Sequence, residues 1–156
     1  MVERQTAELK DCMHLTDHPE AKTYPEQLLE IAKNLFDQGR YGIAIVVAHM
    51  ACEIVVEQVF TAAFKAKKVP ELQKSVTDLL NGYNLANRRI RNVYNALAGD
   101  EIQNKKNAFW QKFKESAARR NRIMHKRQIA SRQEAEETLE ATGDLIAYLD
   151  QKFGTS

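Results

Sequence analysis

The sequence predicts an all-α protein, in which four main helices form an antiparallel bundle with short accessory helices beside them. Three observations lead to this prediction. Only three Pro and six Gly interrupt 156 residues; residues that favour helices dominate; and apolar residues recur at helical spacing with no strand pair. Because we find no internal repeat and no linker, residues 23–156 should form one domain after an N-terminal arm over residues 1–22.

The first long helix is predicted over residues 23–39. Thr23 and Glu26 have the spacing of a capping box, and Pro25 suits the first turn of a helix. Gly39 should end the helix. The apolar stripe is expected to contain Leu28, Leu29, Ile31, Ala32 and Leu35.

The second helix is predicted over residues 41–68 and should be the central, most buried element, because it is apolar on much of its circumference. No apolar run is expected to reach membrane-spanning length, and the nearest one carries His49, Glu53 and Glu57. The expected core positions are Ile43, Val46, Val47, Met50, Ile54 and Phe60.

Two shorter elements follow. A third helix is predicted over residues 71–81, after Pro70 and before Gly82. Residues 84–100 indicate a polar helix or a turn-rich segment, which Gly99 closes.

Two long helices complete the predicted fold. One should follow a cap at Asp100 and cover residues 101–127, and the other should open with a capping box at Ser131 and Glu134 and end at Gly154. The positions expected to face inward are Phe109, Trp110, Phe113, Ala117 and Met124 in the former, and Ala135, Leu139, Thr142, Ile146 and Leu149 in the latter.

Composition excludes several classes of protein. The two cysteines, Cys12 and Cys52, form no CxxC pair and no disulfide framework, which is typical of a reduced, cytoplasmic setting. The polar N-terminus lacks the apolar segment of a signal peptide. The sequence contains no Gly-rich phosphate loop, no HExxH and no GxSxG.

A basic run over residues 119–127 stands out against a net charge of only +2. Its cations are Arg119, Arg120, Arg122, Lys126 and Arg127, whereas residues 131–156 carry two basic and six acidic residues. A local basic patch on a nearly neutral protein indicates a small anionic target or a short stretch of nucleic acid. The simpler alternative is a solvated helix end, where cations meet the negative pole of the helix dipole.

The run contains three side chains that together could cleave RNA. Asn121 and His125 are four residues apart and share a helix face, whereas Arg120 and His125 lie roughly 140° apart around the axis. An imidazole can take the proton of a ribose 2′-hydroxyl, and a guanidinium can stabilise the added negative charge on the phosphate. Because one motif offers only one imidazole, the chemistry predicts a two-fold dimer with facing motifs.

At these residues the chain resembles the HEPN superfamily. The stretch "RNRIMH" (120–125) matches that family's pattern of Arg, polar residue, three variable residues and His. The stretch "LFDQGRYGIAIVVAHMACEIVVE" (35–57) resembles the early HEPN helices, and "SRQEAEETLEATGDLIAYLD" (131–150) resembles the closing helix. The likeness covers roughly residues 24–153.

The resemblance implies a homodimeric helical bundle and, for members with an intact motif, metal-independent endoribonuclease activity without a cofactor. Many such proteins are toxins or defence factors. By position, Arg120 and His125 would be catalytic and Asn121 would support them, while Arg119 also gives an Arg–His spacing that the family allows. Basic neighbours would hold the RNA backbone, namely Arg119, Arg122, Lys126 and Arg127.

Two other functions stay open. A non-catalytic module could use the same basic cleft to bind RNA, a nucleotide or a partner protein, such as an antitoxin or a nucleotidyltransferase-like protein. A purely structural helical dimer is the third possibility.

Further candidate sites have simpler explanations. His49, Cys52 and Glu53 could imitate a metal-binding set, but on an apolar helix a hydrogen-bonded core is favoured. His14 and His18 have the spacing of a zinc pair, with Cys12 and Asp17 nearby and Pro19 against a helix there.

Aromatic and basic side chains elsewhere could also contact RNA. Phe109, Trp110 and Phe113 could stack on bases, although helical spacing favours a core role. A second basic cluster could extend an RNA-binding face or cover an outer helix, and it contains Arg88, Arg89 and Arg91.

Overall fold

A computed structural model describes residues 22–154, and this part of the chain contains six α-helices and no strand. The all-α prediction is therefore confirmed, while nearly all of the predicted N-terminal arm lies outside the described residues. The helices are α2 (Tyr24–Asp37), α3 (Tyr41–Ala66), α4 (Leu72–Leu80), α5 (Arg88–Ala98), α6 (Phe109–Lys126) and α7 (Arg132–Phe153).

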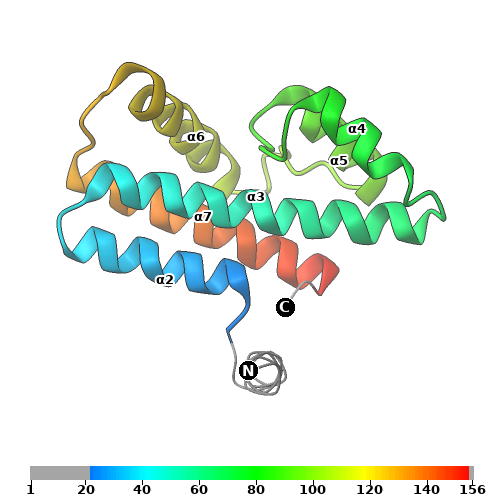
Figure 1. Ribbon diagram of the computed structural model, residues 1–156, viewed down its shortest axis with the longest axis horizontal. Helices are drawn as coiled ribbons and strands as arrows, with labels where there is room; N and C mark the ends of the chain where they lie inside the picture. The colour runs from blue at the N-terminus through cyan, green and yellow to red at the C-terminus, as the bar shows by residue number, and fades with distance from the viewer. Residues whose placement is uncertain (1–21, 155–156) are drawn as a thin grey trace, which may run out of the picture.

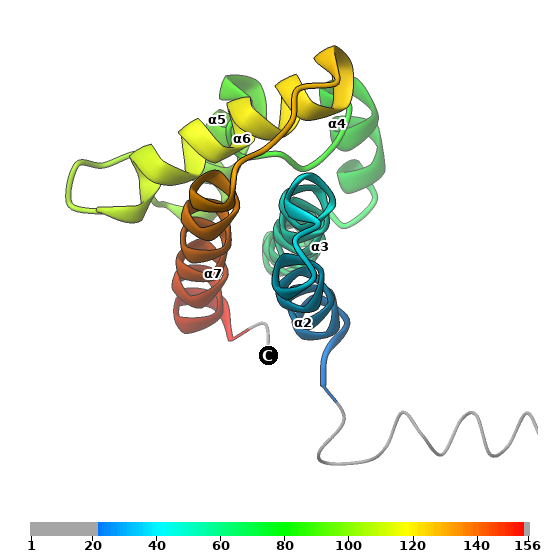
Figure 2. The same ribbon diagram turned by 90° about the vertical axis from the view of Figure 1, so that its left-hand side faces the viewer.

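The helices form two levels. Helices α2, α3 and α7 lie side by side along the long axis of the protein, with α2 antiparallel to α3 (Figure 1). Figure 2 shows α6 crossing above α3 and α7 at a steep angle, with α4 and α5 on the same upper level. Helix α3 contacts each of the other five described helices, which confirms its predicted central position.

The ends of α2 and α7 follow from the predicted caps. The Thr23 backbone N–H donates to Glu26 Oε2 at 2.7 Å, which is the reciprocal half of a capping box. At the start of α7, Ser131 Oγ accepts from the Glu134 backbone at 3.2 Å. Gly154 then ends α7 in the left-handed conformation with φ 61°.

The buried face of α3 differs from the predicted core. Phe60 is fully buried, but Ile43 is 54% exposed and Met50 is also exposed, so these two core predictions are wrong. Because α3 is apolar nearly all round, hydropathy alone does not identify its buried face. Small residues allow its neighbours to approach, and the buried set is Ala44, Ile45, Ala48, His49, Ala51, Cys52, Val55, Val56, Val59, Phe60 and Phe64.

The length and composition of α3 would also suit a membrane span, and it is the one helix among the described residues with this property. The prediction that no apolar run reaches membrane-spanning length is therefore wrong for α3, by length and composition alone. More than half of the most apolar stretch of α3 is buried inside the protein.

Helix α6 begins later than predicted, because residues 101–108 form turns. Asp100 does not cap a long helix. Its carboxylate accepts hydrogen bonds from the Tyr94 hydroxyl at 2.9 Å and the Tyr148 hydroxyl at 2.6 Å. Ile102 is fully buried and anchors the turns.

Two smaller predictions about inward-facing residues and helix ends also need correction. Ile31 on α2 and Met124 on α6 were expected to face inward, but both are exposed. Helix α4 ends at Leu80, and its C-cap is Asn81 in the left-handed conformation, rather than Gly82. Residues 84–100 were predicted as either a helix or a turn-rich segment. Most of them form the helix α5, with Asn87 as its N-cap.

Candidate functional site

The RNxxxH motif occupies the last two turns of α6, next to the loop that leads to α7. The side chains of Asn121 and His125 are exposed, and neither has a hydrogen-bond partner among residues 22–154. The imidazole is therefore open to solvent and to any molecule that approaches the end of α6.

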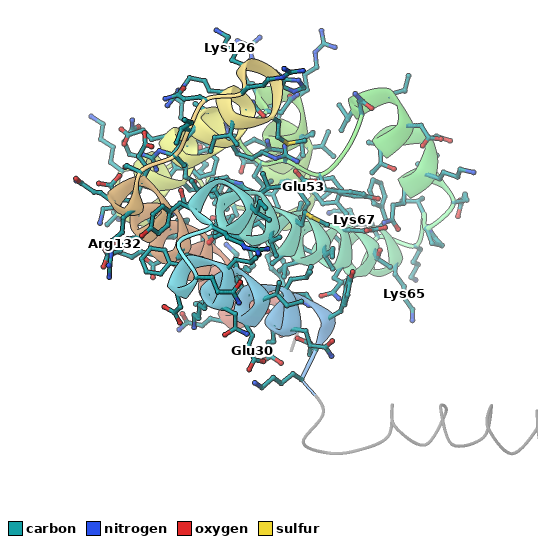
Figure 3. The ribbon with its side chains drawn as sticks, turned by 60° about the vertical axis from the view of Figure 1, so that its left-hand side comes forward. Glu30, Glu53, Lys65, Lys67, Lys126 and Arg132 are labelled. Atoms are coloured by element: carbon teal, nitrogen blue, oxygen red, sulfur yellow. The ribbon has the colours of Figure 1, made fainter. Side chains whose placement is uncertain are left out.

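Arg120 points the other way, towards α3. Its side chain is 18% exposed, and Nη2 lies 3.3 Å from Glu53 Oε1. The Nε atom of Arg120 is buried and has no hydrogen-bond partner within the described part of the chain. Figure 3 labels Glu53 on α3 beneath α6, and Lys126 at the outer end of α6. The guanidinium is thus held by a carboxylate while part of its hydrogen-bonding capacity stays unused.

Arg119 is committed to α7 and is only 12% exposed. Its Nη2 lies 3.1 Å from Glu137 Oε2, and its Nη1 donates to the Glu134 carbonyl at 3.0 Å and to Thr138 Oγ1 at 3.2 Å. These contacts join α6 to α7. The expectation that Arg119 holds RNA stays a prediction, and so does the choice between Arg119 and Arg120 as the motif arginine, because both side chains are mostly buried and paired with a carboxylate.

The other expected backbone-binding residues are more accessible. Arg122 Nε donates to Gln128 Oε1 at 3.0 Å, which bends its side chain towards the loop after α6. Lys126 and Arg127 are exposed, and Arg127 caps the helix with φ 51°. Positive charge therefore gathers at the same end of α6 as His125.

A pocket of about 560 Å³ lies beside the motif. Arg120 and Asn121 line it from α6, Glu53 lines it from α3, and residues 81–90 supply much of the remainder. His125 does not line this pocket, although it follows Asn121 by one helical turn. A single chain therefore brings two of the three motif residues together and leaves the imidazole outside.

His49 is a core residue rather than part of this site. Its Nε2 lies 3.0 Å from Ser116 Oγ, which itself donates to the Phe113 carbonyl at 2.8 Å. Because that donation uses the hydroxyl proton, Nε2 must carry the imidazole proton and donate it. Burial, followed by the positive charge of Arg120, lowers the pKa of His49 from 6.5 to about 4.

The three side chains that could imitate a metal site on α3 have separate partners. His49 contacts Ser116, Glu53 contacts Arg120, and Cys52 Sγ contacts the Thr142 carbonyl at 3.7 Å. Burial raises the pKa of the Cys52 thiol, which keeps the sulfur protonated. The pair of His14 and His18 lies outside the described residues.

The aromatic residues of α6 belong to the core, as their spacing predicts. Trp110 and Phe113 are buried, and Phe109 packs against Tyr148 with ring centroids 5.2 Å apart. The guanidinium of Arg91 lies 5.2 Å from the ring centroid of Trp110. Its Nη1 also donates to the carbonyls of Leu85 and Ala86, so Arg91 is structural. The neighbouring Arg88 and Arg89 are exposed.

Sequence reasoning missed most of the pocket. The motif search selected residues 119–127 and ignored "NGYNLAN" (81–87), where three asparagines recur every third residue. Glu53, considered above with His49 and Cys52, also indicates an ion pair because it is a carboxylate on a largely apolar helix, and Arg120 is its partner.

Comparison of this chain with protein-family models, with curated proteins and with solved structures finds no match.

Proposed function

We propose that this protein is a HEPN-like, metal-independent endoribonuclease that acts as a cytoplasmic homodimer, with a toxin or defence role. The HEPN-type bundle would consist of α2, α3, α6 and α7. The observation that carries the proposal is the placement of the RNxxxH motif at an accessible, positively charged helix end, with His125 open to solvent and Arg120 partly buried beside it.

The chemistry uses one base, one acid and one cation. His125 removes the proton from a ribose 2′-hydroxyl, whose oxygen forms a bond to the adjacent phosphorus. Arg120 stabilises the extra negative charge, with Asn121 orienting the phosphate. The bond from phosphorus to the 5′-oxygen breaks, and the His125 imidazolium of the second protomer gives that oxygen a proton. The products are a 2′,3′-cyclic phosphate and a 5′-hydroxyl.

The dimer part of the proposal is supported by apolar side chains around the motif. Met124 is 50% exposed and Ile129 is 91% exposed, on either side of the basic residues 125–127. Ile129 and Ile43 line a second groove, of about 630 Å³. Exposed apolar groups gathered in one region are typical of an interaction surface. A second copy docked here would place its own His125 near the first.

The Arg120–Glu53 pair also favours a binding role without catalysis. A guanidinium held by a carboxylate can contact a phosphate through its remaining N–H groups without meeting an imidazole. This second candidate is a module that binds RNA, a nucleotide, or an antitoxin or nucleotidyltransferase-like partner. It predicts salt-sensitive binding with no turnover.

Incubation of the purified protein with total RNA separates the two candidates. The ribonuclease should produce fragments ending in 2′,3′-cyclic phosphate, with or without EDTA. His125→Ala should abolish cleavage while leaving the melting temperature unchanged, because the side chain is exposed. Lys105→Ala, in an exposed turn away from the motif, is the matched control and should cleave normally. Cleavage that survives in His125→Ala would exclude the mechanism.

A further inference from the structure

The pocket beside the motif is lined by both apolar and polar residues. Its apolar lining includes Ala86, Ile90, Ala117 and Ala118. Its polar lining, called the polar wall below, contains Glu53, Asn81, Asn84, Asn87, Lys114, Arg120 and Asn121. Its volume of about 560 Å³ lies within the range of small-molecule pockets, roughly 300–1,000 Å³. Such a pocket suits a flat ligand with apolar faces and polar edges.

The polar wall carries donors that the protein itself does not use. The side chains of Lys114, Asn81 and Asn121 have no hydrogen-bond partner among residues 22–154. The amide oxygens of Asn84 and Asn87 accept from backbone N–H groups at 3.0 and 2.9 Å. Their NH₂ groups stay available, because an amide has two donors besides its oxygen.

The charges of the wall favour an anion. Lys114 and Arg120 are cationic, and Glu53 is the one carboxylate among the lining residues. That carboxylate is already paired with Arg120, so Lys114 is left without a counterion within the described part of the chain. An ammonium group beside several free amide donors suits phosphate oxygens and carbonyl oxygens.

We propose that this pocket binds one nucleotide unit, with its phosphate near Lys114 and its base among the asparagine side chains. Amides present both donors and acceptors, which match the edges of a base. Arg120 belongs both to the pocket and to the motif, so a nucleotide bound here lies next to the phosphate that is cleaved. In naming RNA as the source of that nucleotide, the inference rests on the proposed ribonuclease function.

Two substitutions test the pocket without disturbing its walls. Lys114→Gln removes the unpaired cation from an exposed side chain of α6. Asn81→Gly removes an amide and keeps the left-handed backbone that position 81 requires. Lys112→Gln is the matched control, because Lys112 lies on the same helix but its ammonium contacts Glu140 of α7 at 3.5 Å.

The experiment has two arms. The first arm measures binding of the four nucleoside 5′-monophosphates to the full chain by calorimetry. The second arm measures binding of a short RNA in the His125→Ala background, together with KM and kcat for RNA cleavage by the protein with His125 intact. We expect Lys114→Gln to weaken nucleotide and RNA binding by about tenfold and Asn81→Gly by about threefold. KM should rise with kcat nearly unchanged, and Lys112→Gln should resemble the unsubstituted protein.

The outcomes separate this inference from the proposed function. RNA cleavage with equal KM values in Lys114→Gln and Lys112→Gln would overturn the pocket and leave the ribonuclease intact. Nucleotide binding that depends on Lys114 but is not displaced by RNA would support the pocket and overturn RNA as its ligand. Nucleotide binding without any RNA cleavage would support the pocket and refute the ribonuclease. Absence of binding in both arms would refute the inference.

Discussion

Acidification should destabilise this protein through His49, and the loss should begin well above the pH at which carboxylates titrate. The pKa of this buried imidazole is about 4 in the folded protein against 6.5 for the ordinary side chain. Between these values the unfolded chain binds more protons than the folded one, so stability falls as pH falls. The contribution of His49 is complete above pH 6.5 and is lost progressively down to about pH 4.

The size of the loss in unfolding free energy follows from the two pKa values of His49. Each pH unit between them corresponds to about 1.4 kcal/mol, so the full loss is about 3 kcal/mol. From pH 7.5 to pH 5.5 the expected loss is about 1.3 kcal/mol, since only the lower part of that interval lies below the pKa of the unfolded chain. That is a measurable share of the stability of a small domain, which is about 5–15 kcal/mol.

Urea unfolding at pH 7.5, 6.5 and 5.5 measures this loss. His49→Gln keeps an N–H donor for Ser116 but cannot ionise, so its free energy of unfolding should fall by about 1.3 kcal/mol less than that of the unsubstituted protein over this interval. Lys105→Ala, which alters an exposed turn and leaves His49 in place, should keep the original slope. Parallel curves for His49→Gln and the unsubstituted protein would refute the reasoning.

Three further predictions concern other contacts. Glu53→Gln should lower the free energy of unfolding in urea by about 1 kcal/mol, because the ion pair with Arg120 is lost. The same change should tighten RNA binding at low salt, because no carboxylate then competes for Arg120, and weaker RNA binding would contradict this. Asp100→Asn should cost about 2 kcal/mol, because the carboxylate accepts from two tyrosine hydroxyls and pairs with Lys152. Burial alone would raise the pKa of Asp100, but the hydrogen bonds from Tyr148, Lys152 and Tyr94 lower it. The contribution of Asp100 to stability is therefore present above about pH 4 and is lost as pH falls further. An acid unfolding transition that is the same in Asp100→Asn and in the unsubstituted protein would contradict this prediction. Ile129→Asp should shift the proposed dimer to monomer in sedimentation velocity and reduce the proposed RNA cleavage, whereas an unchanged sedimentation coefficient would contradict this interface.

The sequence predicts much of the fold because several helix ends carry local chemical signals. The caps at Thr23 and Ser131 and the stop at Gly154 depend only on neighbouring residues. The start of α6, in contrast, does not depend only on neighbouring residues. Asp100 is a good local cap, but its carboxylate is drawn to Tyr148, 48 residues away, and that contact is not visible in a local pattern.

The candidate site is predictable only in part for the same reason. The motif identifies Arg120 and His125, and helical geometry already separates their directions by roughly 140°. The partners of the arginines come from other helices: Glu53 for Arg120, and α7 for Arg119. Two adjacent arginines therefore look equivalent in the sequence and have different roles in the structure.

The contact between His49 and Ser116 also constrains how this chain can diverge. Replacing either residue alone by an apolar one leaves a buried polar atom without its partner, whereas replacing both together by apolar groups of similar shape can be nearly neutral. Positions 49 and 116 should therefore covary in homologous chains, as a polar pair or as an apolar pair. Such covariation would mark the crossing of α3 and α6 in sequences whose structures are not known.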